Sequence, residues 1–598
     1  MASSSSLGPN MHFIKSREIA DVDPNYLFYI NSLERNQSSS LSETMIPVIG
    51  RIKEIGLTAW KNLGSVVFGS QVFHKKLDCW IVTAYVPHVM FRDVRKQNGV
   101  LSLKVAQTVQ PMLYQTLQTI RLSQQHFIPP AFPPDILNQG GEGVVVGIVD
   151  YGCDFNHERF KIDSTHTRIL SIWNQQTGPN PHGPYQVGTV YQRDEINAAL
   201  AQPNPYQALG YAPGPSAHGT HVMDIATGNS GVAPKAEIIF VHLRTLGSFH
   251  KSGGKDLVDA VDYIFQQAHH RPCVVNLSIG TNLGPHDGTN STEDAFDAHV
   301  TGEPNRAIVI AAGNFGESKI HQSGKILQGE QIDLTWDIKD KGNAIHKMQI
   351  WYSGEDEFKC AVCAPIGPMS SDISLREKSN IYYSPSLAQV LIGGVTSPEQ
   401  VFIGEVAHCF HDDNNGDNVF SIEIHPNNIA ILGEWKIKLS GEQIKNGNFH
   451  AWIERNDFYQ SEFRVSDANC TLSSIATGAD TIVVGAYNGV NNEIFPPSSA
   501  GPTRTGALKP EVSAPGVSVI AASSEGDLVA MSGTSMAAPV ITGLIARILG
   551  IASSMDKTLN VDQIKTILTP LDGPHNLKLG FSQARANEII QRALTELA

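Results

Sequence analysis

The sequence is short of charged residues, and the charges it has are more often negative than positive. Only 17% of the 598 residues are charged, against about a quarter in an average protein, which excludes a chain kept disordered by self-repulsion. Lys and Arg number 44 and Asp and Glu 58, so the net charge is −14, and we expect no nucleic-acid partner and no membrane partner. The hydrophobic share of 41% predicts a globular protein with a sizeable core.

The N-terminal segment lacks the apolar stretch of a secretory signal, because residues 1–21 are Ser-rich and then charged. The strongest apolar runs, such as 144–149 and 308–312, have the length of strands and fall short of the roughly 20 residues that span a bilayer. The seven cysteines are odd in number and mostly scattered, which argues against a disulfide framework. We therefore expect a soluble, cytoplasmic protein.

The first part of the chain divides into three segments. Residues 1–44 are too polar to pack and predict a weakly ordered leader. Residues 45–115 contain short strand-like runs and one helical stretch, which favours a small α+β domain. A linker over 116–128 follows. It ends at the prolines of 129–134, each of which fixes its own φ and biases the preceding residue out of the helical region.

Two further segments, 129–316 and 470–598, share one pattern. Apolar runs of strand length alternate there with helical stretches, at 144–149, 238–241, 274–277, 308–312 and 482–484. This alternation is typical of a parallel sheet covered by helices on both faces, so we predict an α/β fold. Between these two segments, residues 317–469 change to strands in which every second residue is apolar, and they predict an inserted antiparallel β-sandwich with half-exposed strands.

Three motifs place polar residues where an α/β sheet gathers its chemistry, at the end of a strand or the start of a helix. Asp150 ends an apolar strand. His218 precedes Gly-Thr-His-Val at 219–222, where a helix begins. Ser535 lies in Gly-Thr-Ser-Met-Ala at 533–537, at the start of a long apolar helix whose unpaired N–H groups favour negative charge. Each residue alone is also explained by a structural role, and the three together favour catalysis.

In the chain order Asp, His, Ser, these motifs resemble those of the subtilisin-like serine peptidases, the subtilases of the S8 family. The resemblance covers about 320 residues and includes Gly-Val-Ala-Pro at 231–234, Asn-Leu-Ser-Ile-Gly at 276–280 and Ala-Ala-Gly-Asn at 311–314. The inserted β-rich segment is similar to that of bacterial subtilases which carry a jelly-roll domain and act in germination. The resemblance implies a serine endopeptidase with a subtilisin-like sheet.

The resemblance also implies a role for each residue. Ser535 would be the nucleophile, and His218 would take its proton and later pass it to the leaving amine. Asp150 would orient and stabilise the imidazolium, and Asn314 would donate a side-chain N–H to the oxyanion. An extended peptide would bind by strand addition. The expected substrate-binding residues are Ser278, Ile279, Gly280, Ala312, Gly313 and Phe315.

In position and strand order, residues 45–115 resemble a subtilase propeptide, which assists folding and inhibits the enzyme until it is cut. The segment near Leu113, Tyr114 and Leu117 would then run through the active-site cleft. We expect a zymogen that cuts itself between about residues 109 and 127. The expected partners are a protein or peptide substrate and the protein's own propeptide.

Two other functions remain open. Some subtilases of the jelly-roll group have lost triad residues, so the chain could be a catalytically silent scaffold or sensor that binds an extended peptide. Alternatively, self-cleavage could be the only reaction, with the propeptide kept bound. Reaction with a fluorophosphonate separates the silent scaffold from an enzyme, because only an activated serine is labelled.

No cofactor and no metal are predicted. A zinc site is disfavoured because a single CxxC is weak evidence and the alternation around it indicates strand residues that face opposite ways. Its candidate ligands are Cys360, Cys363, His408, Cys409 and His411. Asp413, Asn415 and Asp417 stand at alternate positions as in a calcium loop, and a polar hairpin turn explains them as well. The loop in which many subtilases hold calcium is reduced here to 228–230.

Overall fold

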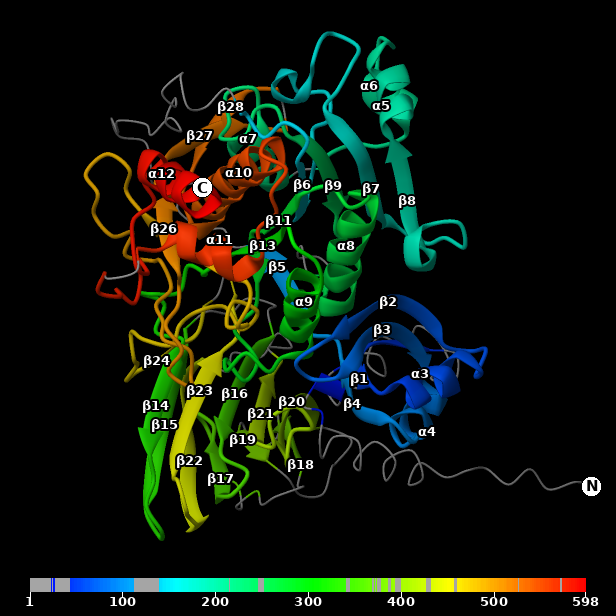
Figure 1. The fold of residues 1–598 in the computed structure, drawn as a ribbon. Coiled ribbons are helices and arrows are strands. Elements are labelled where there is room, and N and C mark those ends of the chain that lie inside the picture. The colour runs from blue at the N-terminus through cyan, green and yellow to red at the C-terminus, as the bar shows by residue number, and fades with distance from the viewer. Residues whose placement is uncertain are drawn as a thin grey trace, which may run out of the picture.

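The computed structural model contains a small N-terminal domain, a central α/β unit and an elongated antiparallel β unit (Figure 1). It describes part of the chain: 44–111, 139–245, 252–339, 345–425, 432–456 and 460–598, apart from 215, 368–369, 371–372, 374–377, 385–388, 393–399, 525 and 571–572, and nearer the N-terminus Asp23, Asn25, Tyr26 and Tyr29. The expected linker at 116–128, and with it Leu113, Tyr114 and Leu117, lies outside the described residues.

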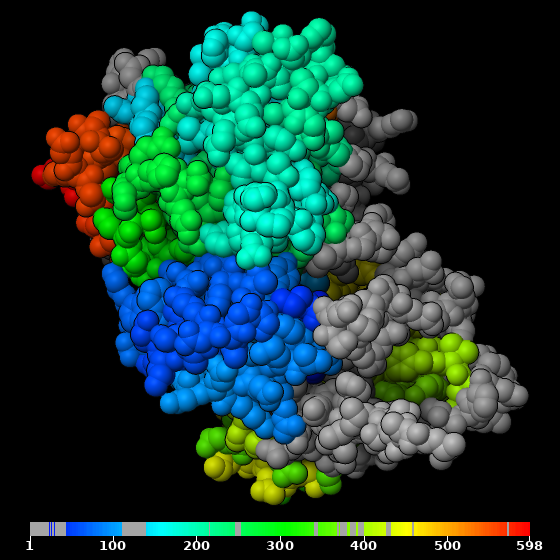
Figure 2. Space-filling view, turned by 90° about the vertical axis from the view of Figure 1, so that its right-hand side faces the viewer, coloured from blue at the N-terminus to red at the C-terminus, as the bar shows by residue number. Residues whose placement is uncertain are grey.

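The N-terminal domain is an antiparallel four-stranded sheet, ordered β2-β3-β1-β4, with two short helices. Its elements are β1 (Met45–Ile52), α3 (Glu54–Lys61), β2 (Val67–His74), β3 (Cys79–Pro87), α4 (Phe91–Arg95) and β4 (Val100–Val105). Trp60 of α3 and Phe91 of α4 are fully buried and fill the core between helices and sheet. The sheet lies on the central unit through α8 (Gly254–Gln267) and α9 (Ser291–Gly302). In the space-filling view this domain, coloured blue, lies directly against the cyan and green surface of the central unit (Figure 2).

Part of the expected leader is packed, contrary to the prediction for residues 1–44. Tyr26 is 2% exposed and stacks on Phe91 with the ring centroids 4.8 Å apart. The buried carboxylate of Asp23 accepts a hydrogen bond from the backbone N–H of Val105 at 2.6 Å. The signal for this packing is in the sequence, because residues 26–30 read Tyr-Leu-Phe-Tyr-Ile, a short apolar stretch within an otherwise polar segment.

The central unit is built on an eight-stranded sheet, ordered β26-β25-β13-β11-β6-β9-β7-β8, whose neighbours are parallel except β7 and β8. The five strands expected from apolar runs lie side by side at its centre: β25 (Ile482–Tyr487), β13 (Arg306–Ala311), β11 (Cys273–Leu277), β6 (Val145–Asp150) and β9 (Glu237–His242). The remaining strands are β26 (Val512–Pro515), β7 (Ile169–Pro179) and β8 (Val187–Gln192). The predicted α/β fold is confirmed.

Helices cover both faces of this sheet, because alternate side chains of each strand point to opposite sides. Ile148 of β6 packs in the apolar cluster that includes α7 (His218–Thr227) and α10 (Thr534–Ser554), and Val149 packs in the cluster that includes α8 and α9. The other helices of the unit are α5 (Arg193–Leu200), α6 (Pro205–Leu209), α11 (Val561–Leu568) and α12 (Ala586–Leu597).

Helix α10 differs from the expectation that apolar runs have only strand length. By length and composition it could cross a membrane, but the apolar stretch is fully buried inside the protein. Its side chains face the central sheet and α7 instead, which is typical of a core helix.

The inserted unit has two antiparallel sheets that share one apolar core containing Trp336, Ile350, Phe358 and Trp435. The seven-stranded sheet contains β14 (His321–Lys325), β23 (Asn448–Ile453), β16 (His346–Tyr352), β21 (Asn418–Ile424), β20 (Val401–Cys409), β18 (Lys378–Ser384) and β19 (Gln389–Ile392). The four-stranded sheet contains β17 (Glu357–Cys363), β22 (Gly433–Gln443), β15 (Gln331–Ile338) and β24 (Glu462–Phe463). The predicted antiparallel sandwich is confirmed.

One strand of the sandwich is more buried than its pattern predicts. β22 alternates buried and more accessible residues as expected, but β21 is buried on both faces. The polar Glu423 of β21 forms ion pairs with Lys347, at 2.9 Å, and with His425. These partners lower the pKa of Glu423 to about 2 in spite of its burial. A paired charge can be buried at a strand position that otherwise faces water.

Candidate active site

The end of β6 and the start of α7 bring Asp150 and His218 together. Asp150 is the last residue of β6, and His218 is the first residue of α7. Nδ1 of His218 lies 2.7 Å from Oδ1 of Asp150, which also accepts the backbone N–H of Tyr151 at 2.7 Å. With its proton on Nδ1, the imidazole carries a lone pair on Nε2 and can accept a proton there.

Two glycines allow this close approach. The backbone N–H of Gly219 donates to the carbonyl of Tyr151 at 3.1 Å, and a Cβ on Gly219 would lie 2.4 Å from the carbonyl oxygen of Gly152. Gly152 itself has φ +84°, and a Cβ there would meet the carbonyl of Ser216. Any side chain at residue 219 therefore pushes α7 away from the end of β6.

Ser535 is the second residue of α10, where the helix leaves backbone N–H groups without partners inside the helix. Its hydroxyl donates to the carbonyl of Ser278 at 3.3 Å, and Ser278 Oγ donates to the carbonyl of Ser535 at 3.0 Å. Nε2 of His218 has no hydrogen-bond partner within the described parts of the chain. Of the two hydrogen bonds expected in the row, the one between Asp150 and His218 is present, and the one between His218 Nε2 and Ser535 is not formed in this structure.

The amide of Asn314 is held in one orientation by the residue before the serine. Oδ1 of Asn314 accepts the backbone N–H of Thr534 at 2.9 Å and its hydroxyl at 3.1 Å. The hydroxyl oxygen of Thr534 in turn accepts the backbone N–H of Gly313 at 3.2 Å. Because its amide oxygen is held by Thr534, the Asn314 side chain has one fixed orientation, and only its NH₂ group can act as a hydrogen-bond donor.

A buried polar chain behind Ser535 was not recognised as functional from the sequence. Thr542 Oγ1 donates to Oδ1 of Asn276, and Nδ2 of Asn276 donates to Oγ of Ser278, both at 3.0 Å. Thr542 lies two helical turns after Ser535 and on the same face of α10. A polar residue at that spacing within an apolar helix is the signal that points to it.

The expected peptide-binding residues form the edge of a small sheet. β12 (Ile279–Gly280) and β10 (Ser252–Gly253) lie on either side of β5 (Thr108–Pro111), and both pair with it in antiparallel register. Pro111 pairs with Ile279 and Gln110 with Gly280. The strand between the two edges therefore comes from the end of the N-terminal domain, at the place where a peptide was expected to bind.

The remaining predicted residues lie beside this edge. Ala312 is buried and follows β13, and its carbonyl accepts the backbone N–H of Ser473 at 2.8 Å. Gly313 has φ +111°. The backbone N–H of Phe315 donates to Ser499 Oγ at 3.0 Å, and the Phe315 ring is 5% exposed.

The site is closed to solvent in this structure. Asp150, His218 and Ser535 all have 0% exposed surface. A substrate can reach the serine only if some part of the surrounding chain moves away. β5 lies between β10 and β12, so the groove expected to bind a peptide is occupied by a strand of the protein itself.

His221, three residues after His218 in α7, makes a structural contact. Its Nε2 lies 3.0 Å from the carbonyl oxygens of Val519 and Val529, in the hairpin of β27 (Val519–Ala522) and β28 (Leu528–Met531). Burial lowers the pKa of His221 to about 4, so the ring is neutral at pH 7. The N–H of a neutral ring can donate a hydrogen bond to these carbonyls and so hold the hairpin against α7.

The residues considered for metals have other partners. Cys360 and Cys363 lie on β17, in the four-stranded sheet, whereas His408 and Cys409 lie on β20, in the other sheet. His411 Nε2 lies 3.0 Å from the carbonyl of Gly354. Where the chain is described, no three His, Cys, Asp or Glu residues are grouped to hold a metal.

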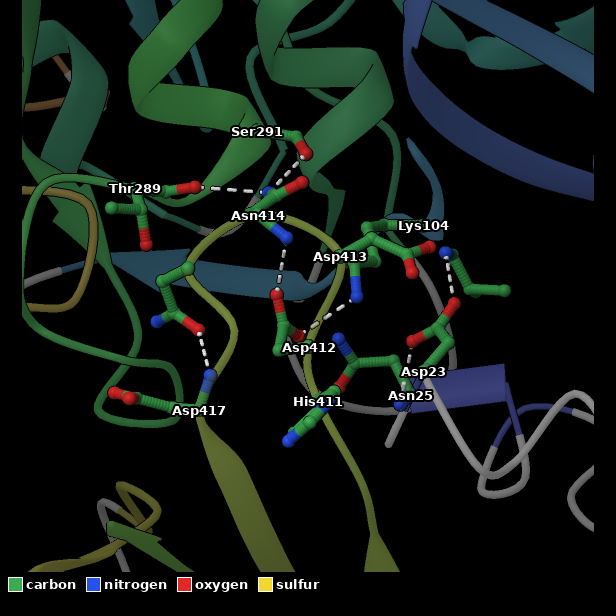
Figure 3. Close-up of polar contacts among 12 residues, drawn as sticks. Asp23, Asn25, Lys104, Thr289, Ser291, His411, Asp412, Asp413, Asn414 and Asp417 are labelled. Atoms are coloured by element: carbon green, nitrogen blue, oxygen red, sulfur yellow. Dashed lines mark hydrogen bonds and ion pairs between the residues drawn. The ribbon is translucent and has the colours of Figure 1, made fainter. Parts of the chain in front are cut away.

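The polar loop at 411–418 joins three parts of the molecule (Figure 3). Asp413 pairs with Arg95 of the N-terminal domain at 2.6 Å, and Asp417 pairs with Arg504 at 2.6 Å. Nδ2 of Asn415 donates to Asp287 at 2.9 Å. The alternate acidic positions that resemble a calcium loop are thus engaged by protein cations and an amide.

Comparison with known proteins places this geometry in a family. The model of the subtilase family of peptidases matches residues 141–342 and 447–570, more than half of the chain, and the interval that it skips lies within the sandwich. The solved structure of the Clostridium perfringens CspB protease is 26% identical, with a TM-score of 0.65, and the match covers 77% of this chain and 95% of that one.

Curated relatives are more distant and longer. The C5a peptidase of Streptococcus pyogenes is 21% identical over 463 residues, which is 68% of this chain and 34% of the relative. The subtilisin-like protease SBT2.2 of Arabidopsis thaliana is 29% identical over 203 residues, covering 30% of this chain and 23% of the relative. The chain thus spans about a third or less of the length of these relatives. On the family match, the chain belongs to the subtilase family of serine peptidases.

Proposed function

We propose that the protein is a serine endopeptidase that uses Asp150, His218 and Ser535 as a catalytic triad. The observation that carries the proposal is the 2.7 Å contact between Asp150 and the His218 imidazole, which leaves Nε2 as the basic atom beside α10, the helix that carries Ser535 in its first turn. Family membership supports the same reaction class.

In the proposed mechanism, Ser535 turns from the Ser278 carbonyl towards His218 Nε2. Oγ then bonds to the carbonyl carbon of the substrate while its proton passes to Nε2. Asp150 stabilises the imidazolium, and the oxyanion accepts hydrogen bonds from the Asn314 NH₂ group and the backbone N–H of Ser535. Nε2 then gives the proton to the leaving amine as the C–N bond breaks. Water then adds to the acyl carbon while its proton passes to Nε2, and the acid product leaves as the bond to Ser535 Oγ breaks and Oγ regains the proton.

We further propose that the N-terminal domain is an inhibitory propeptide. β5 fills the groove between β10 and β12. The domain is also held by ion pairs of Arg51 with Asp294 and of Lys104 with Asp412, both at 2.8 Å. Because β5 ends opposite Ile279, next to the Ser278 that contacts Ser535, the proposed self-cleavage falls soon after Pro111.

The proposed substrate is an extended protein or peptide segment. Val109 of β5 is 1% exposed and packs in the apolar cluster that contains Leu257 and Ile279. If a substrate follows the path of β5, its residue at this position is apolar. The net charge of −14 gives no broad electrostatic attraction for nucleic acid. In this proposal a peptide substrate is recognised by its contacts in the groove.

The second candidate is a peptide-binding protein that does not turn over. It is favoured by the hydrogen bond of Ser535 to Ser278 in place of His218, and by the occupied groove. The two functions differ in whether the serine is activated.

A fluorophosphonate probe followed by mass mapping tests the proposal. The peptidase predicts covalent labelling at Ser535 in the wild-type chain and none in Ser535→Ala. The intact masses of the same two proteins test self-cleavage, since only wild type should lose its N-terminal part. A wild-type chain that stays unlabelled under conditions in which it is folded contradicts the peptidase and favours the binding protein.

A further inference from the structure

The side chain of Gln110 is covered by the inserted sandwich. Successive residues of a strand point to opposite faces, so Gln110 points away from the apolar side that receives Val109. Gln110 is nevertheless only 8% exposed. Its Nε2 donates to the backbone carbonyl of Arg455 at 3.3 Å, and Arg455 belongs to the segment that directly follows β23.

Glu454 fixes this segment to the peptide-binding edge. Its carboxylate accepts the hydroxyl of Thr281 at 2.6 Å and the backbone N–H of Asn282 at 3.0 Å, and these two residues directly follow β12. It also accepts the N–H of Arg455 at 2.7 Å. Nδ2 of Asn282 donates to the carbonyl of Ile453 at 3.3 Å. These hydrogen bonds therefore fix the position of the sandwich relative to the peptide-binding edge at β12.

The side chain of Arg455 adds a second attachment. It is 3% exposed, and its guanidinium carbon lies 5.7 Å from the centroid of the Phe315 ring, which follows Asn314. A cation at this distance from an aromatic face is attracted to it. With the side chain and the preceding residue both anchored, the carbonyl of Arg455 is presented in one direction.

We propose that the inserted sandwich forms a subsite of the peptide-binding groove, in which the Arg455 carbonyl selects a glutamine in the residue that pairs with Gly280. The substrate class is an extended peptide with an apolar residue followed by glutamine, as in Val109-Gln110. This inference rests on the proposed function in that the groove binds peptides for hydrolysis. Glu454 is a positioning residue for the subsite.

Other side chains at this position lose the interaction. Leucine removes the hydrogen bond to the Arg455 carbonyl, and glutamate places a carboxylate against the carbonyl oxygen. We expect each change to lower kcat/KM by about tenfold, which corresponds to the loss of one net hydrogen bond.

The first test uses octapeptides that copy residues 108–115, Thr-Val-Gln-Pro-Met-Leu-Tyr-Gln, with Gln, Leu or Glu as the third residue. Wild type should prefer Gln by about tenfold, and Glu454→Ala should bring the Gln-to-Leu ratio close to one. Glu434→Ala is the matched control, because Glu434 lies on the same sandwich with 34% of its side chain exposed. It should keep the wild-type ratio. Equal cleavage of the three peptides by wild type overturns the subsite and leaves the peptidase intact.

The second test does not depend on activity. In full-length Ser535→Ala chains, hydrogen exchange of the amides in residues 108–110 should be at least about fivefold faster with Gln110→Leu or Glu454→Ala than without, and unchanged with Glu434→Ala. If no peptide is cut but this pattern holds, the peptidase fails and the subsite stands as a binding site. Unchanged exchange in both Gln110→Leu and Glu454→Ala overturns the subsite.

Discussion

At the scale of single residues, the site depends on which atom each polar group faces. The Asn314 amide oxygen is engaged by Thr534, and this orients the amide NH₂ group, which is the proposed donor to the oxyanion. Ser278 holds both the hydroxyl and the carbonyl of Ser535. In the proposed mechanism, the hydroxyl of Ser535 leaves the Ser278 carbonyl and turns to His218 Nε2 before it attacks the substrate.

Replacing Asn314 with alanine should lower kcat by about 10²–10³-fold, the cost known for the corresponding donor in subtilisin, a member of this family. KM should change little, because the donor is used mainly in the transition state. Steady-state peptide hydrolysis measures both constants. Asn491→Ala, at an exposed loop position, is the control and should match wild type. A loss of less than fivefold in Asn314→Ala would show that this residue is not an oxyanion donor.

Replacing Gly219 with alanine should separate His218 from Asp150, because the new Cβ would lie 2.4 Å from the Gly152 carbonyl oxygen. We expect kcat/KM to fall by at least about 100-fold and the free energy of unfolding to fall by about 1–3 kcal/mol. Kinetics and urea unfolding measure the two effects. Gly302→Ala is the matched control, since a Cβ there meets nothing within 4 Å. Wild-type kinetics in Gly219→Ala would rule out the close approach.

At the scale of elements, the strands of the central sheet could be predicted because continuous apolar runs leave few alternatives. β7 was missed because polar residues such as Asn174 and Gln175 interrupt its apolar run and yet are buried. Local motifs and the family resemblance were enough to predict the contact of Asp150 with His218, and the triad itself stays a prediction. The Ser278–Ser535 contact and the Glu454 anchor could not be predicted, because they join residues far apart in sequence, and only the fold brings them together.

Helix α9 buries a carboxylate that makes stability depend on pH. Burial raises the pKa of Glu293 to about 8, although its carboxylate accepts the N–H and hydroxyl of Thr477 at 2.6 and 2.8 Å. Because this pKa is raised in the folded state, Glu293 adds to the free energy of unfolding at pH values below 4.5, its ordinary pKa. This addition is lost as the pH rises towards 8. Glu293→Gln keeps the acceptor and removes the titration.

We therefore expect Glu293→Gln to gain stability relative to wild type as the pH rises from 5 to 8. Urea unfolding at the two pH values measures the difference. Glu303→Gln, with 46% of its side chain exposed near the end of α9, is the control and should show no such trend. A difference between Glu293→Gln and wild type that is the same at both pH values would contradict the raised pKa.

At the scale of the whole molecule, the sandwich contacts both the groove and the N-terminal domain. Its loop at 411–418 carries Asp412, which pairs with Lys104 of β4, and Asn414, whose Nδ2 donates to the carbonyl of Thr289 and the hydroxyl of Ser291 at the start of α9 (Figure 3). The Lys104 and Asp412 side chains are only 11% and 9% exposed. Removing one charge from such a pair lowers the free energy of unfolding by several kcal/mol, because the other charge stays buried without its partner.

Asp412→Asn should loosen the N-terminal domain and speed the reaction of the full-length chain with a fluorophosphonate by at least about tenfold. Asparagine keeps the acceptor for the Asn414 N–H, so the loop itself is preserved. Asp527→Asn, at an exposed position away from the domain, should label at the wild-type rate. Equal rates for Asp412→Asn and wild type would mean that this pair does not restrict access to Ser535.

The most direct test of the triad is whether its members act as one unit. The kcat for a peptide that wild type cleaves is measured for Ser535→Ala, His218→Ala and the double variant. The proposed mechanism predicts that each single change removes at least about 10⁴-fold of kcat and that the double variant is no slower than the singles. Losses that multiply in the double variant, or a Ser535→Ala chain as active as wild type, would contradict it.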